Sequence, residues 1–238
     1  LVDARFRIRK ALEIEPYNTG LHMAIAHSYE IIRQFDSAQD LVEQAINADG
    51  AEDMQDFDAL LYLAQLYAFD RKLERIADVA TRVERILPAG ETDAREYAGQ
   101  RFAQAGWQLA HVQAFEAAVP FLEAARRFLP RDEDLAQLLQ TCQGLLRAAE
   151  EFRLLMKDRH IHDTVKRACG FWLAENAGQF SEEEGKAKFQ EVVDKISNMT
   201  MASLKSSLER VRTSYPSVYA CGDEFFKQLL ANIRHAEV

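Results

Sequence analysis

The chain has 238 residues, which is enough for two medium domains or one long helical array. Hydrophobic residues make up 48% and charged residues 28%, and only 5 prolines and 10 glycines occur, too few for the frequent turns of a β-sandwich or barrel. The formal net charge of −9 disfavours nucleic acid or an anionic membrane as the main partner, and no apolar run approaches the roughly 18 residues of a membrane span. We therefore expect a soluble, nearly all-helical protein.

Charge divides the chain into two parts. Residues 1–150 hold 16 Lys and Arg against 25 Asp and Glu, whereas residues 151–238 hold 13 of each kind. We place a boundary near residue 150, within sequence typical of helices, and predict two domains, 1–150 and 151–238. The three cysteines are odd in number and far apart, which favours a reducing compartment over a disulfide framework.

The first part contains an internal repeat. A small or aliphatic residue recurs at spacings of 34, 38 and 42, and a second column, seven residues further on, recurs at the same spacings. Because both columns change their spacing in the same way, the sequence predicts one structural unit that is present four times. The first column is Ala4, Ala38, Ile76 and Ala118, and the second is Ala11, Ala45, Val83 and Ala125.

An amphipathic helix precedes these columns in the last three copies. Its apolar residues fall at i, i+3 or i+4, and i+7 or i+8, which is the stripe of one helix face. A small residue at one fixed place, Ala26, Ala64 or Gly106, lets the second helix of each pair approach closely. Such a pair cannot bury its apolar face alone and must stack on its neighbours.

These residues resemble the tetratricopeptide repeat (TPR) family, in which a small residue and a Tyr lie on helix A, an Ala-rich pattern lies on helix B, and a Pro closes the repeat. The resemblance covers residues 1–150 and implies an all-α solenoid of helix pairs in a right-handed superhelix. The implied copies are a half repeat at 1–18, three repeats at 19–52, 57–90 and 99–132, and a loose fifth copy at 133–156.

The repeats depart from the family in sequence and in length. His22 stands where Trp is usual, Ile76 where Ala is usual, and Leu109 where Tyr is usual. The longer spacings exceed the family's length of about 34, so extra residues lie in the connections 51–56 and 89–98 or lengthen the helices there. Because the chain starts inside a helix B, we expect a fragment of a longer protein.

The resemblance also implies that the A helices line a concave groove that holds a peptide. The lining is aromatic and apolar, and aromatic side chains give a large contact area at low entropic cost. Family members that clamp the carboxylate tail of a chaperone use cations here, and this groove has none, which disfavours such a partner. Alternatively, Phe69 and Trp107 fill gaps between helices. The implied groove residues are Met23, His27, Tyr62, Gln65, Phe69, Gln104, Trp107 and His111.

The sequence of residues 151–238 predicts four helices, which form a small bundle or cap the solenoid. An apolar stripe marks a helix over 158–178, and Ser181 with Glu184 predicts a capping box at the start of the next one. A third stripe, 201–211, ends before Pro216, because the residue before a proline avoids the helical region. This stripe forms core or, alternatively, a dimerisation face.

Motifs that carry chemistry are missing from the sequence. It has no Gly-rich phosphate loop, no Gly-x-Ser-x-Gly elbow and no His-Glu-x-x-His zinc motif. His160 and His162 are two residues apart, so on a helix they point in different directions and do not form a metal site. Cys169 lies in an apolar stripe, which indicates a buried thiol. We expect no catalysis, no cofactor and no metal.

The sequence therefore favours a cytoplasmic interaction scaffold that binds a peptide or helix of a partner protein. An apolar or basic segment fits the groove better than an acidic carboxylate tail. Two alternatives remain open. The chain is a regulatory or substrate-recruiting segment of a larger enzyme, or it is a structural TPR protein that assembles with copies of itself.

Overall fold

A computed structural model describes residues 6, 10–15, 18–47, 56–87, 90 and 92–236, with side chains described up to residue 231. All regular secondary structure in these residues is helical, as predicted. The chain divides into two compact units, residues 1–139 (unit 1) and 140–238 (unit 2). The division lies inside one helix, as does the charge boundary near residue 150.

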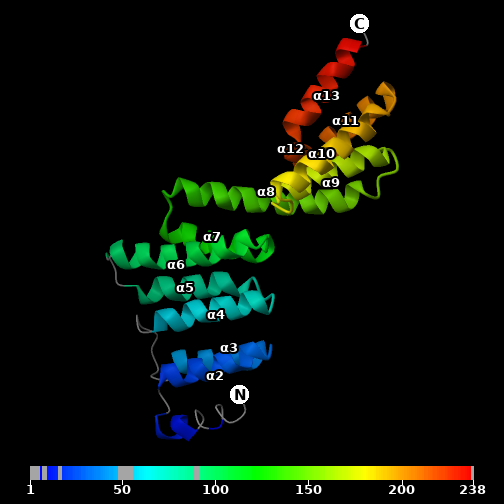
Figure 1. The fold of residues 1–238 in the computed structure, drawn as a ribbon. Helices are drawn as coiled ribbons and strands as arrows, with labels where there is room; N and C mark the ends of the chain where they lie inside the picture. The colour runs from blue at the N-terminus through cyan, green and yellow to red at the C-terminus, as the bar shows by residue number, and fades with distance from the viewer. Residues whose placement is uncertain are drawn as a thin grey trace. The chain divides into compact units, whose positions relative to one another are not determined.

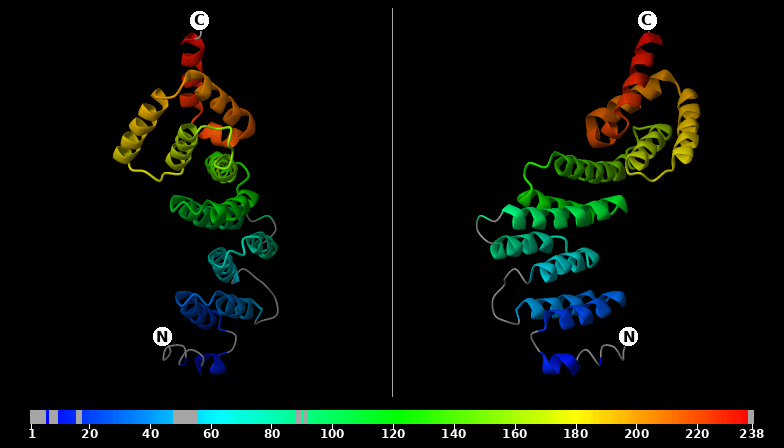
Figure 2. Two further views of the ribbon diagram at one scale, coloured as in Figure 1. Left: turned by 90° about the vertical axis from the view of Figure 1, so that its right-hand side faces the viewer. Right: turned by 60° about the vertical axis from the view of Figure 1, so that its left-hand side comes forward.

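Unit 1 is built from three successive helix pairs among its described residues. Figures 1 and 2 show these pairs stacked one on another in chain order. Within each pair the helices are antiparallel and joined by a short turn. The pairs are α2 (Thr19–Ile31) with α3 (Phe35–Ile46), α4 (Phe57–Phe69) with α5 (Arg75–Ile86), and α6 (Thr92–His111) with α7 (Phe115–Phe128).

The turn inside each pair has the same backbone geometry. Its central residue has a positive φ of 58° at Arg33, 60° at Arg71 and 63° at Gln113. The next residue donates its N–H to the carbonyl five positions earlier. The positive φ and this hydrogen bond together form a Schellman-type helix end. These bonds run from Gln34 to Tyr29, Lys72 to Tyr67 and Ala114 to Leu109, each at 2.9 Å.

The core of unit 1 follows the two predicted columns. Where the columns fall in described helix pairs, each side chain is at most 3% exposed, so these predictions are confirmed. Ala4 lies outside the described residues, and Ala11 is half-buried. The small residues Ala26, Ala64 and Gly106 are buried as well. A Cβ on Gly106 would lie 2.7 Å from the Leu122 side chain, so α6 and α7 pack too closely there for a larger residue.

The predicted extra length between repeats and the predicted fifth copy can be compared with the helices of the structure. The extra length in the fourth copy lies partly in a longer helix, because α6 starts at Thr92. Residues 48–55, most of the acidic connection, lie outside the described residues, as does most of the half repeat. The expected loose fifth copy at 133–156 folds as one continuous helix, α8 (Glu133–Leu155), rather than as a pair of its own. No proline interrupts the sequence of this helix.

Unit 2 holds the rest of α8 and five further helices. The capping box is confirmed, because the Ser181 side chain bonds the N–H of Glu184 and the Glu184 carboxylate bonds the N–H of Ser181. A short helix that begins at Pro216 was not predicted from the sequence. The helices are α9 (Asp163–Asn176), α10 (Glu182–Ser197), α11 (Met201–Ser214), α12 (Pro216–Cys221) and α13 (Asp223–Ala236).

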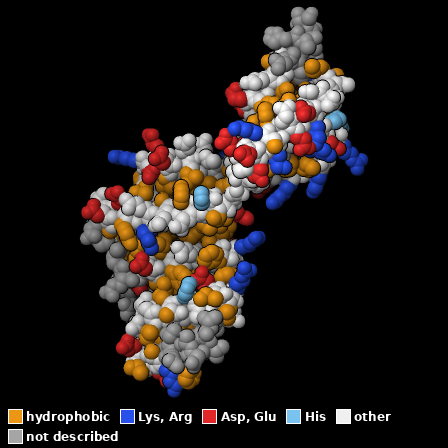
Figure 3. All heavy atoms as spheres, in the orientation of Figure 1, with side chains coloured by type: hydrophobic (Ala, Val, Ile, Leu, Met, Phe, Trp, Pro, Cys, Tyr) orange, Lys and Arg blue, Asp and Glu red, His pale blue; other side chains and the backbone are white. Residues whose placement is uncertain are grey.

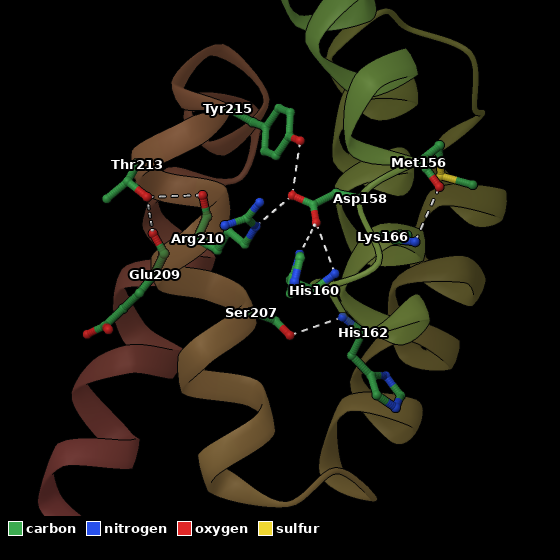
Figure 4. A network of polar contacts seen from close by, with 10 residues as sticks. All are labelled: Met156, Asp158, His160, His162, Lys166, Ser207, Glu209, Arg210, Thr213 and Tyr215. Atoms are coloured by element: carbon green, nitrogen blue, oxygen red, sulfur yellow. Dashed lines mark hydrogen bonds and ion pairs between the residues drawn. The ribbon is translucent and has the colours of Figure 1, made fainter.

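Asp158 fastens the loop between α8 and α9 onto the end of α11 (Figure 4). Its carboxylate accepts hydrogen bonds from Arg210 Nε at 2.6 Å, Tyr215 Oη at 3.1 Å and the backbone N–H of His160 at 2.9 Å. The side chain is only 5% exposed. The Arg210 guanidinium and these other donors hold the pKa of Asp158 well below its usual range.

Aromatic rings fill the core of unit 2. Phe171, Trp172, Phe189 and Phe225 lie in successive contact, with ring centroids 5.0–6.2 Å apart. Gly222 lets α12 approach this cluster, because a Cβ there would lie 2.6 Å from Trp172. This packing accounts for the predicted apolar stripes of α9, α10 and α11. Leu204, Leu208 and Val211 of α11 are buried in this core, as ordinary core packing requires.

Candidate functional site

The predicted groove residues lie on α2, α4 and α6, the first helix of each pair. These three helices contain few residues that break a helix. Asn18 caps the start of α2, because its side chain accepts the N–H of Leu21. The exposed members of the set are Phe69 (53%) and Trp107 (57%), together with His27, Gln104 and His111. Met23, Tyr62 and Gln65 are half-buried.

Tyr62 and His27 meet at one carboxylate. Tyr62 Oη donates to Glu30 Oε2 at 2.6 Å, and His27 Nδ1 lies 3.0 Å from the same oxygen. Burial, and then the hydrogen bond to Glu30, raise the pKa of Tyr62 above its usual range, so the phenol stays protonated and donates. This contact joins α4 to α2, so Tyr62 fixes the two helices in register as well as lining their face.

Gln65 and Phe69 line a hollow of about 310 Å³ between α4 and α6. The far wall belongs to α6, and Phe121 of α7 also lines the hollow. Phe69 also stacks on Phe35 of α3 with centroids 6.2 Å apart, which fixes one edge of the hollow. The remaining lining residues are Ala68, Ala105, Gln108, Leu109 and Val112.

Trp107 and His111 stack on each other one turn apart on α6. Their ring centroids are 5.3 Å apart and their planes differ by 7°. Trp107 is therefore held flat against His111 with more than half of its surface exposed, rather than filling a gap between helices. Neither ring lines the hollow, and Gln104 and Met23 do not line it either.

The structure thus brings six of the eight predicted residues together in three pairs, leaves Met23 and Gln104 outside them, and adds residues that were not predicted. Two of these unpredicted lining residues are exposed, Val112 at 69% and Gln108, both on the wall of the hollow. The repeat spacing could have predicted Val112. It lies 80 residues after Ile32, and 80 is the sum of the column spacings 38 and 42. Ile32 is 41% exposed, and the preceding Ile31 is 57% exposed.

Reactive groups elsewhere in the described residues have structural contacts. In these residues no cluster of His, Cys, Asp and Glu is arranged to hold a metal ion. His162 accepts the N–H of Thr164 at the start of α9, and His160 bonds Asp158. Cys169 is fully buried, and burial raises the pKa of its thiol to about 12, which disfavours the thiolate.

Comparison of the chain with protein-family models, with curated proteins and with solved structures finds no match. The likeness to the TPR family therefore rests on the residues and the repeated geometry of unit 1. Among the described helices, none is long and apolar enough to cross a membrane.

Proposed function

We propose that unit 1 is a TPR-like solenoid whose α2, α4 and α6 face binds a peptide or helix of a partner protein, without catalysis. The solenoid part of the proposal is supported by the repeated turn. Arg33, Arg71 and Gln113 adopt the same left-handed conformation, and they are spaced by 38 and 42 residues like both buried columns. Equivalent turns at equivalent spacing are what repeated helix pairs require.

The observation that carries the binding proposal is the row of large apolar side chains left exposed at the ends of the first helices. Ile31 ends α2, Phe69 ends α4, and Trp107 lies in the last two turns of α6, each more than half exposed. Hydrophobic side chains also reach the surface of this unit in the space-filling view (Figure 3). Exposed aromatic and aliphatic groups that gather on one face are typical of protein interaction sites.

The chemistry of the face sets the kind of partner. The hollow between α4 and α6 has apolar walls with two amides, Gln65 and Gln108, that can bond a peptide backbone. No charged residue lines the hollow, and the Glu30 carboxylate of α2 bonds Tyr62 on the same face. An apolar segment, or one with a basic residue near Glu30, therefore fits better than an acidic tail.

A peptide selection tests this proposal. The full chain is panned against a displayed library of random peptides, and the affinity of each selected peptide is measured by fluorescence anisotropy for the unaltered chain and three variants. Trp107→Ala and Phe69→Ala remove exposed rings of the face, whereas Leu154→Ala removes a side chain of unit 2 that is 61% exposed. Tyr62 is left intact because it bonds Glu30.

We expect the selected peptides to lose about tenfold or more in affinity for Trp107→Ala or Phe69→Ala and about twofold or less for Leu154→Ala. If none of the selected peptides loses affinity for Trp107→Ala or Phe69→Ala, the face is not a binding groove. A library that yields no saturable binder would count against the proposal too.

A further inference from the structure

A second pocket lies in unit 2, between α9 and α10, on helices that have no part in the proposed function. Its walls are apolar, formed by Phe171 and Val192, which are 8% and 9% exposed, and by Phe180 in the loop between the two helices. Phe180 stacks on Phe171 with centroids 5.8 Å apart and planes 12° apart. The pocket has a volume of about 240 Å³ and opens to solvent beside these rings.

The rim of this pocket is cationic. Arg167 of α9 and Lys188 and Lys195 of α10 surround it, with Glu191 as the one carboxylate among the lining residues. Lys195 already pairs with Glu191. Arg167 and Lys188 also attract the Glu191 carboxylate, and Lys188 attracts Glu184, but neither forms an ion pair with a described residue. The three cations of the lining therefore outnumber its one carboxylate at the mouth of an aromatic pocket. Figure 3 shows Lys and Arg beside hydrophobic side chains on this unit.

Lys188 belongs to the cationic rim and also contacts an aromatic ring of the pocket wall. Its ammonium lies 5.3 Å from the centroid of the Phe180 ring, where the face of the ring attracts a cation. From this place an exposed Lys can turn to a carboxylate while a guest ring takes its position on Phe180. An aromatic guest pairs with Phe180 and Phe171 in the same way that these two rings pair with each other.

We propose that this pocket binds an acidic peptide segment of a partner protein that carries an aromatic side chain. The aromatic side chain enters between Phe180 and Val192, and carboxylates beside it pair with Arg167 and Lys188. A long polyanion such as nucleic acid fits less well, because the first turn of α10 presents the exposed carboxylates of Glu182 and Glu183 and repels extended negative charge. Charge complementarity therefore favours a short acidic segment.

The test uses a fluorescein-labelled peptide of sequence Asp-Glu-Phe-Glu-Asp, titrated with the full chain at low ionic strength and followed by anisotropy. A second peptide has Gly in place of Phe. Lys188→Glu reverses a rim charge, and Lys186→Glu is the matched control, because Lys186 lies on the same helix, is exposed, and pairs with Glu182 outside the pocket. Thermal unfolding followed by circular dichroism checks that both variants fold.

We expect saturable binding of the Phe peptide, a loss of about tenfold or more for Lys188→Glu, and a loss of about threefold or less for Lys186→Glu. The Gly peptide should bind about tenfold or more weakly, since it lacks the ring. Absence of saturable binding, equal losses in the two variants, or equal binding of the two peptides would overturn the proposal. Trp107→Ala should leave this binding unchanged, so the test is independent of the face on unit 1.

Discussion

Tyr62 of α4 donates a hydrogen bond of 2.6 Å to the Glu30 carboxylate of α2, and this bond joins the first helices of two successive pairs. It shows that a residue of the proposed face can also hold the repeats together. A substitution there changes two properties at once, the surface offered to a peptide and the spacing of the helices that offer it.

Tyr62→Phe keeps the ring and removes the donor. Because Glu30 then loses a charged hydrogen bond in a half-buried place, we expect the free energy of unfolding to fall by about 1–2 kcal/mol. Urea unfolding followed by circular dichroism measures it. The control is Tyr97→Phe, since Tyr97 is 48% exposed and its hydroxyl forms no hydrogen bond with a described residue. If both variants lost the same stability, the bond to Glu30 would have no special part in it.

The glycines of α6 and α8 make a matched pair for close packing. A Cβ on Gly106 would meet the Leu122 side chain at 2.7 and 2.8 Å and its backbone N at 3.2 Å, whereas a Cβ on Gly144 would meet nothing within 4 Å. We expect Gly106→Ala to lower the free energy of unfolding by about 1–3 kcal/mol, because α7 must move away. Gly144→Ala should raise it by about 0.5–1 kcal/mol, since alanine favours a helix interior.

Chemical denaturation measures both glycine variants. The two tryptophans, Trp107 and Trp172, lie one in each unit, so fluorescence in chains that keep a single tryptophan assigns each change to its unit. The packing argument fails if Gly106→Ala is as stable as the unaltered chain.

Much of the helical core was predictable because it depends on local pattern. Ala38 and Ala118 are fully buried where the repeat spacing placed them, and Ser181 caps α10 through its own hydroxyl. The left-handed turns escaped prediction, because Arg33 and Arg71 occupy positions where glycine is the usual signal.

The candidate face was harder to predict than the core. The bond between Tyr62 and Glu30 joins residues 32 positions apart, and the wall of the hollow at Val112 depends on how α4 lies against α6. Such contacts follow from the packing of helix pairs rather than from the periodicity of either helix. Sequence periodicity gives the face of a helix, and tertiary packing decides which part of that face stays open.

The Asp158 network predicts how unit 2 responds to acid. The pKa of Asp158 is lowered in the folded state, so the unfolded chain binds a proton first as the pH falls below about 4. Stability from this group is therefore complete above that pH and is lost as the pH falls further, through the folded pKa. Asp158→Asn should lower stability by about 1–3 kcal/mol at neutral pH, since Arg210 loses its charged partner.

The same substitution should also flatten the pH dependence. We expect the difference in unfolding free energy between the unaltered chain and Asp158→Asn to shrink steadily below about pH 4. Urea unfolding at several pH values, with Trp172 as the probe of unit 2, measures this difference, and subtraction cancels the other carboxylates. A difference that stays constant down to the lowest pH at which the chain folds would show that the ionised form of Asp158 has no part in fastening α11.

The left-handed turn at Arg33 offers a stabilising substitution. Its φ of 58° costs any residue with a Cβ about 1 kcal/mol or more, and a glycine there avoids this cost while adding freedom to the unfolded chain. We expect Arg33→Gly to raise the free energy of unfolding by about 0.5–1 kcal/mol in urea, because the Schellman-type bonds from this turn to Glu30 and Tyr29 need only the backbone. Arg33→Ala keeps the Cβ and should gain nothing. A loss of stability in Arg33→Gly would mean that the Arg33 side chain itself supports the turn, and the same comparison at Arg71 would show whether that support recurs from one helix pair to the next.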